Sequence, residues 1–186
     1  MGALATYEPI TSIQIDAHLD WRDSVNGAKE GCSSGIRRAS ESPFIKDIFQ
    51  IGLRSIRIGQ EKEMNAALRY GANLIGANET HEIGIEAILN RILSGGRFYL
   101  MVDADGIDSI VTPSVNVPNP GGLTWLKVRK FIHGIVNKGR VLGVDLMELS
   151  DLSNEFLQSL LFRRTGLVQT PGSQRRRFGG CAKCTG

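Results

Sequence analysis

The sequence predicts an α/β domain in which a parallel sheet is flanked by helices. Three observations carry this prediction. Short apolar runs bounded by turn residues recur along the chain, and segments with helical spacing of apolar residues separate them. The runs are almost continuously apolar, as expected of strands that are buried on both faces. A length of 186 residues with 41% hydrophobic residues suits one domain with one sizeable core.

Five strands and three helices are expected in alternation. The strands are predicted at residues 12–16, 48–53, 72–76, 98–103 and 141–147. The helices are predicted where apolar residues recur three and four positions apart, at residues 61–70, 81–93 and 124–137. Each helix is followed by a stop signal, namely Gly71, Gly95 with Gly96, and Lys138 with Gly139. Strands that alternate with helices favour a parallel sheet covered by helices on both faces.

The periodic pattern ends after residue 160. We therefore predict one domain over residues 1–160 and a basic, disordered tail over residues 161–186. The formal charge is +3, but the last 24 residues hold six basic residues and no acidic one. The rest of the chain is mildly acidic, so nucleic acid is not expected as a partner. Cys181 and Cys184 in the tail form a single pair, which is weak evidence for zinc.

Composition predicts a cytoplasmic protein with no membrane partner. No run approaches the roughly 20 apolar residues of a membrane span, and residues 1–16 lack the charged and apolar regions of a signal peptide. Three cysteines are too few for a disulfide framework in a chain of this length. A reducing compartment is therefore expected.

The first candidate site follows the first predicted strand. Asp16, His18 and Asp20 alternate in sequence, and in an extended segment alternate side chains point the same way. Two carboxylates and one imidazole suit a divalent ion such as Mn²⁺. The structural alternative is that Asp16 caps a turn and His18 is an ordinary loop residue.

The second candidate site follows the fourth predicted strand, where Asp103 and Asp105 also lie two residues apart. Ligands of parallel sheets bind beyond the carboxyl ends of the strands, so both motifs are expected to face one crevice. Several carboxylates buried together without cations would repel one another and lose their hydration. A pair of metal ions would remove this cost. The alternative is that Asp103 and Asp105 are solvated loop acids.

The motifs DAHLD, VDADGID and VDLMELS, with the loop VTPSVNVPNPGGLT, resemble those of the ureohydrolase family, which comprises the arginases and agmatinases. The resemblance runs from Ile13 to Ser150, and the string HLDWRDSVNGAKEGCSSGIRRASE is most similar to agmatinase-type members. It implies an arginase-like three-layer fold and two Mn²⁺ ions per site. It also implies hydrolysis of the guanidino group of a small, agmatine-like amine to urea and an amine.

The resemblance also assigns metal ligands. Asp16 and Asp103 resemble the carboxylates that bridge both ions. His18 and Asp105 resemble ligands of one ion, and Asp20 resembles a ligand of the other.

Catalysis and substrate binding are assigned in the same way. Asp20 would hold the attacking hydroxide and pass on its proton. Glu148 resembles the acid that faces the substrate guanidinium, and Thr124 falls in the GGLT turn near the substrate. A small guanidino compound is the expected partner, and the complete protein is expected to be a homo-oligomer.

Three departures from the family pattern bear on activity. A His-bearing GGDH-like segment upstream is absent, a Ser-His-Gly turn reads Ser-Ser-Gly at residues 33–35, and the usual Pro after the Glu motif is Asp151. We therefore expect an incomplete domain, truncated at both ends, with the SIQID strand as an exposed edge. The alternative function is a catalytically incomplete chain with a structural or assembly role. A structural role is favoured for His81, which is also the candidate to replace the missing ligand.

Overall fold

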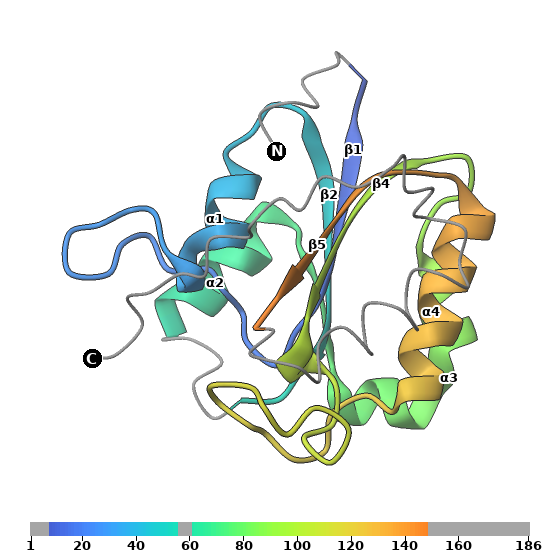
Figure 1. Ribbon diagram of the computed structural model, residues 1–186. Coiled ribbons are helices and arrows are strands. Elements are labelled where there is room, and N and C mark those ends of the chain that lie inside the picture. Colours follow the sequence, from blue (N-terminus) through green and yellow to red (C-terminus); the bar gives the residue numbers. More distant parts are fainter. Residues whose placement is uncertain (1–7, 56–60, 149–186) are drawn as a thin grey trace, which may run out of the picture.

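A five-stranded parallel sheet forms the middle layer of the protein, with helices on both of its faces (Figure 1). The computed structural model describes residues 8–55 and 61–148. The strands are β1 (Ile10–Ile15), β2 (Ile45–Leu53), β3 (Asn73–Gly76), β4 (Arg97–Asp103) and β5 (Arg140–Met147). The helices are α1 (Gly35–Ser40), α2 (Glu61–Tyr70), α3 (Ala77–Arg91) and α4 (Trp125–Lys138), with short 3-10 helices η2 (Cys32–Ser34) and η3 (Ala104–Gly106).

The predicted fold class is confirmed. Helices α1 and α2 cover one face of the sheet, and α3 and α4 cover the other (Figure 1), which makes three layers. All four strand pairings are parallel. Each predicted strand is present.

The helices differ from the sequence prediction mainly at the start of α3 and in the presence of α1, while the other predicted ends lie within two residues of the observed ones. Helix α3 begins at Ala77 rather than at residue 81, and it bends at Gly84, where φ is 79°. A bend shifts the apolar face, so the residues before it do not continue the helical period of the residues after it. The six-residue helix α1 was not predicted, because one and a half turns are too short to establish a period of 3.6.

The order of strands is β3-β2-β1-β4-β5, so β1 lies in the centre of the sheet. The expectation that the SIQID strand forms an exposed edge is therefore wrong. After β1 the chain winds toward one side through β2 and β3, then returns to the other side of β1 through β4 and β5. This reversal places a topological switch point between β1 and β4, which is where ligands bind in open α/β sheets.

Two apolar clusters pack on the two faces of the sheet. One contains Ile13 and Ile15 of β1 with the buried faces of α3 and α4. The other lies beneath α1 and α2 and contains Trp21, which stacks at a tilt on Tyr70. Because strand residues alternate between faces, Gln14 lies on the side opposite to Ile13 and Ile15. Gln14 is almost fully buried there, next to Asp16 at the end of the same strand.

Several expectations fall on residues 149–186, outside the described part. These are the domain boundary at residue 160, the disordered tail, Asp151 and the pair Cys181 and Cys184.

Within the described ranges, no helix combines the length and the apolar character that crossing a bilayer requires. Cys32 is disulfide-bonded, which the sequence analysis did not predict.

Candidate metal centre

The site forms where β1 and β4 end side by side. Ile15 of β1 pairs with Val102 of β4, so Asp16 and Asp103 end neighbouring strands at the same edge. The chain then turns through η3 directly against the end of β1. A Cβ atom on Gly106 would lie 2.7 Å from the backbone nitrogen of Asp16, so a residue without a side chain is needed there. This close approach brings Asp105 back onto the first motif.

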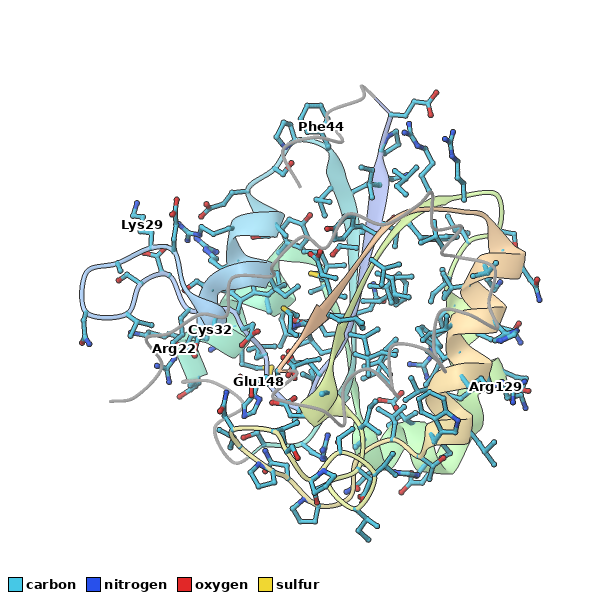
Figure 2. The ribbon with its side chains drawn as sticks, in the orientation of Figure 1. Arg22, Lys29, Cys32, Phe44, Arg129 and Glu148 are labelled. Atoms are coloured by element: carbon cyan, nitrogen blue, oxygen red, sulfur yellow. The ribbon has the colours of Figure 1, made fainter. Side chains whose placement is uncertain are left out.

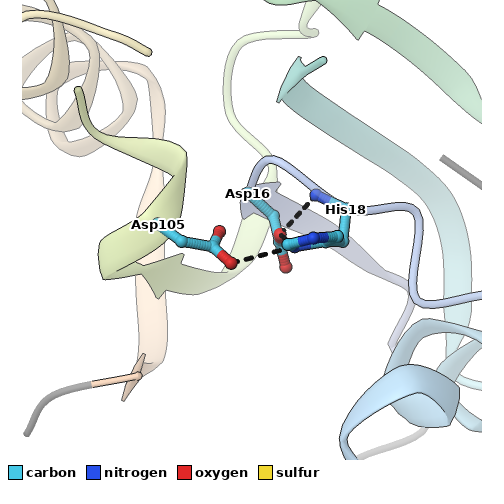
Figure 3. Close-up of side chains that lie close together, drawn as sticks. All are labelled: Asp16, His18 and Asp105. Atoms are coloured by element: carbon cyan, nitrogen blue, oxygen red, sulfur yellow. Dashed lines mark hydrogen bonds and ion pairs between the residues drawn. The ribbon is translucent and has the colours of Figure 1, made fainter. Parts of the chain in front are cut away.

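Asp16, His18 and Asp105 form one compact cluster (Figure 3). One ligand atom from each of the three lies within 4.8 Å of the others. His18 Nδ1 is 2.9 Å from Asp105 Oδ2 and 3.5 Å from Asp16 Oδ1. Backbone N–H groups of the first motif hold the carboxylates in place. Ala17 N–H donates to Asp105 Oδ1 at 3.1 Å, and His18 N–H donates to Asp16 Oδ1 at 2.6 Å.

Asp103 and Asp20 lie beside this cluster and are bonded into it. Asp103 Oδ1 accepts a hydrogen bond from Asp105 N–H at 2.9 Å. Gln14 Nε2 donates to Asp16 Oδ2 at 2.6 Å and to Asp20 Oδ2 at 3.5 Å. The five residues predicted as metal ligands are therefore linked to one another at the ends of β1 and β4, although only Asp16, His18 and Asp105 meet as a single ligand group among the described residues.

Burial and mutual repulsion disturb the ionisation of these acids. Burial raises the pKa of Asp16 well above its usual range, and the charges of Asp20 and Asp105 add to this effect. Burial, together with the charges of Asp16 and Asp105, raises the pKa of Asp103 to about 10. Burial raises the pKa of Asp20 to about 7. Without a cation, the crevice keeps protons on carboxyl groups that are normally ionised at neutral pH.

Attraction to the neighbouring carboxylates makes His18 basic. Hydrogen bonds to Asp105 and Asp16 raise the pKa of His18 to about 10. For Asp105, burial acts to raise the pKa, but the bonds from His18 and Ala17 N–H outweigh it and hold the pKa below its usual range. The imidazolium thus supplies positive charge beside the ionised Asp105. A divalent cation would supply the same compensation, so the donor set of carboxylate oxygens and one imidazole nitrogen fits such an ion.

Glu148 and Thr124 have different surroundings. Glu148 follows β5 at the edge where β4 also ends (Figure 2), and its Oε2 accepts from Asn116 N–H at 3.0 Å. Its charge contributes to the raised pKa values of Asp103 and Asp20, so it acts on the same crevice. Thr124 is exposed and caps α4, with its hydroxyl accepting from Lys127 N–H at 3.3 Å. A substrate contact for Thr124 stays a prediction.

His81 lies away from the cluster and links α3 to the Gly-Gly turn before α4. Its Nε2 is 3.0 Å from the carbonyl oxygen of Gly122, and its Nδ1 is 2.8 Å from Lys127 Nζ. Both ring nitrogens are therefore engaged by the protein. This agrees with a structural role and does not support His81 as a replacement metal ligand.

Sequence reasoning missed a pair of buried glutamines behind the cluster. Gln50 of β2 pairs in register with Gln14 of β1 and donates to Gln14 Oε1 at 2.6 Å and to the carbonyl oxygen of Leu19 at 2.7 Å. Gln14 in turn donates to Asp16 and Asp20. Both side chains are almost fully buried. A lone amide residue inside each of two apolar strands was the signal that could have found them.

The sequence of residues 1–155 matches the model of the Arginase family. The chain is 31% identical to the guanidinobutyrase of Pseudomonas aeruginosa over 143 aligned residues. The alignment covers 74% of this chain and 44% of that protein. It is 32% identical to the N(1)-aminopropylagmatine ureohydrolase of a Synechocystis species over 148 aligned residues. That alignment covers 78% of this chain and 46% of that protein. The chain thus spans about half the length of these curated relatives.

Solved structures show the same fold. The agmatine ureohydrolase of Thermoplasma volcanium superposes with a TM-score of 0.70 at 29% identity, covering 89% of this chain and 54% of that one. The arginase of Bacillus cereus gives a TM-score of 0.73 at 18% identity over 91% of this chain and 66% of that one, and that likeness concerns the fold alone.

Proposed function

The chain belongs to the arginase family, and from this premise we propose that it is an agmatinase-like ureohydrolase. The proposed reaction is hydrolysis of the guanidino group of a small amine to urea and an amine. The observation that carries the proposal is the cluster at the ends of β1 and β4, where two acidic motifs remote in sequence come together around His18. Relatives named for guanidinobutyrate, aminopropylagmatine and agmatine support a guanidino compound as the substrate class.

Divalent metal is part of the proposal, with Mn²⁺ as the ion and two ions per site. Asp16, His18 and Asp105 would hold one ion, Asp20 would bind the other, and Asp16 and Asp103 would serve both. Bound metal would lower the pKa of a water molecule so that hydroxide is available near neutral pH. The protein's contribution is to hold these ligands before metal arrives, through the Gln14 amide and the backbone N–H groups of Ala17, His18 and Asp105.

We propose that Asp20 is the proton carrier of the reaction. It would accept the proton of the attacking water and deliver it to the departing amine, as a carboxylate beside the reacting group can do. The Gln14 amide, whose Nε2 donates to Asp20 Oδ2 at 3.5 Å, would help to orient it.

Glu148 is proposed to bind the substrate cation. A carboxylate pairs with a planar guanidinium through two parallel hydrogen bonds. Asn116 N–H holds one oxygen of Glu148, so the carboxylate is positioned from the loop between η3 and α4. Thr124 is retained in the proposal as a residue near the substrate.

The experiment is a urea-release assay of the full chain with agmatine, guanidinobutyrate and arginine, in Mn²⁺ and in EDTA. We expect Mn²⁺-dependent urea release from at least one compound. The Asp105→Asn variant is the matched control and should release none. Tight Mn²⁺ binding without urea from any compound would instead favour the alternative, a catalytically incomplete chain with a structural or assembly role.

Cytoplasmic location and homo-oligomeric assembly of the complete protein also belong to the proposal. Fractionation of the cells that make the protein tests the first. Light scattering after size-exclusion chromatography tests the second, and a monomeric mass at micromolar concentration would contradict it.

A further inference from the structure

Arg54 is the first residue after β2, and its guanidinium group, with five N–H donors, lies within hydrogen-bond distance of six backbone carbonyl oxygens, so that at least one N–H is shared. Its Nη2 donates to Asp105 at 2.6 Å, Asn119 at 2.8 Å and Ile107 at 3.2 Å. Its Nη1 donates to Gly52 at 3.2 Å and Gly106 at 3.3 Å, and its Nε donates to Pro120 at 3.1 Å. One side chain therefore joins the end of β2, residues 105–107 at the end of η3, and residues 119–120 of the following loop.

These carbonyl groups belong to the two segments that the proposed reaction needs. Residues 105–107 carry the cluster residue Asp105 and the Gly106 that lies against Asp16. Residues 119–120 end the loop that carries Asn116, whose N–H group holds Glu148. Arg54 is thus bonded to the backbone of both segments, one carrying a residue of the candidate metal centre and the other leading from Asn116, which holds the candidate substrate carboxylate.

A guanidinium group suits this position for two reasons. Its five N–H donors are spread in a plane, so it satisfies several carbonyl groups at once, whereas a lysine ammonium has three donors at one point. Its charge is also surrounded by Asp16, Asp105 and Asp108. The half-buried cation therefore stays compensated, and with its donors occupied it is not directed at the substrate.

We infer that Arg54 is a positioning residue. It fixes Asp105 relative to the loop that carries Asn116, whose N–H group holds Glu148. This inference rests on the proposed function and deepens it. Arg54 touches neither the metal ligands' donor atoms nor the substrate carboxylate. It acts through the backbone of residues 105–107 and 119–120.

A second anchor at the base of the same loop allows the two effects to be separated. Asp108 Oδ2 accepts from the N–H groups of Gly121 and Gly122 at 2.9 and 3.0 Å, and Asp108 Oδ1 accepts from Ile110 N–H at 3.0 Å. Asp108 thus closes the loop without bonding to residues 105–106. Replacing Asp108 by Asn would turn one acceptor into a donor and loosen the loop, while the Arg54 bond to Asp105 remains.

The test compares Arg54→Lys with Asp108→Asn in the full chain, and Arg91→Lys is the matched control. Arg91 forms an ion pair with Glu79 on the exposed side of α3, so its variant should behave like the wild type. The readouts are the Kd of Mn²⁺ by calorimetry, amide hydrogen exchange at Asn116, the melting temperature, and kcat and KM for the best guanidino compound.

We expect Arg54→Lys to weaken Mn²⁺ binding by about tenfold or more, as for other residues that orient metal ligands. Amide exchange at Asn116 should become faster, kcat should fall and KM should rise. Asp108→Asn should speed exchange and raise KM, with the Kd of Mn²⁺ within about twofold of the wild type.

Two outcomes would overturn the inference. One is an Arg54→Lys protein with a lower melting temperature but wild-type Mn²⁺ affinity and Asn116 exchange, which would make Arg54 a structural residue only. The other is an Asp108→Asn protein whose amide exchange at Asn116 and whose KM are unchanged from the wild type. This outcome decides the question even if Arg54→Lys fails to fold. If the wild type hydrolyses no guanidino compound, the proposed function fails, whereas Mn²⁺ affinity and exchange still decide the role of Arg54.

Discussion

At the scale of single residues, the acids of the crevice are destabilising until a cation binds. The pKa of Asp103 is raised to about 10, chiefly by burial and then by Asp16 and Asp105. The folded protein therefore holds a proton that the unfolded chain releases above pH 4. A raised carboxyl pKa contributes stability that is present below pH 4 and is lost as the pH rises toward 10.

Replacing Asp103 by Asn removes this penalty while keeping an acceptor for Asp105 N–H. We expect metal-free Asp103→Asn to melt a few degrees higher than the wild type at neutral pH. The wild type should also lose more melting temperature than the variant between pH 5 and pH 9. Thermal unfolding in EDTA measures both. A variant that melts lower than the wild type at every pH would mean that the Asp103 charge is not a burden on the metal-free fold.

The bridging role assigned to Asp103 leads to a second prediction at this scale. A carboxylate that serves two ions contributes more bonds and charge than one that serves a single ion. Asp103→Asn should therefore lose Mn²⁺ more completely than Asp105→Asn. Elemental analysis of both proteins after loading and desalting gives the metal content. Equal content in the two variants would count against bridging by Asp103.

At the scale of elements, the turn after β4 depends on close contact with the end of β1. A methyl group at Gly106 would meet the backbone of Asp16 and Ile15 at 2.7–2.9 Å. Because backbone atoms cannot move aside, we expect Gly106→Ala to cost roughly 1–3 kcal/mol of stability and to weaken Mn²⁺ binding. Gly35, the first residue of α1, has open space around it and is the matched control. Equal melting temperatures for the two alanine variants would contradict this account.

Helix α4 offers a prediction that separates the two roles considered for Thr124. As an N-cap, Thr124→Ala should cost about 1 kcal/mol, whereas Thr124→Asp should retain most of the capping energy. Thermal unfolding tests the cap. A change of KM in Thr124→Asp, whose fold is kept, would support the predicted substrate contact, and an unchanged KM would leave Thr124 with the cap alone.

At the scale of the whole molecule, metal binding should couple to folding. A ligand that binds only the folded state stabilises it by about 2.7 kcal/mol at a free concentration of 100 times its Kd. For a chain of this size, that corresponds to a rise in melting temperature of about 5–10 °C. Mn²⁺ should produce this rise and Mg²⁺ a smaller one, because an imidazole ligand favours Mn²⁺ over Mg²⁺. Equal shifts in wild type and Asp105→Asn would show that the ions act elsewhere.

The fold class, the five strands and the acidic motifs could all be predicted from the amino-acid sequence. These features are local. Apolar runs, helical spacing and alternate residues such as Asp16 and His18 are written within a few neighbouring positions, and the physics of strands and helices acts over the same distance.

Which strands are neighbours, and which side chains lie behind the motifs, could be read only from the packed chain, as the central place of β1 shows. The bond from His18 to Asp105, the buried Gln14–Gln50 pair and five of the six carbonyl contacts of Arg54 join residues at least 36 positions apart. Their energies depend on burial and on the direction in which the chain winds about β1. Those properties arise only when distant segments pack together, because charge interactions and hydrogen bonds gain their strength from the exclusion of water.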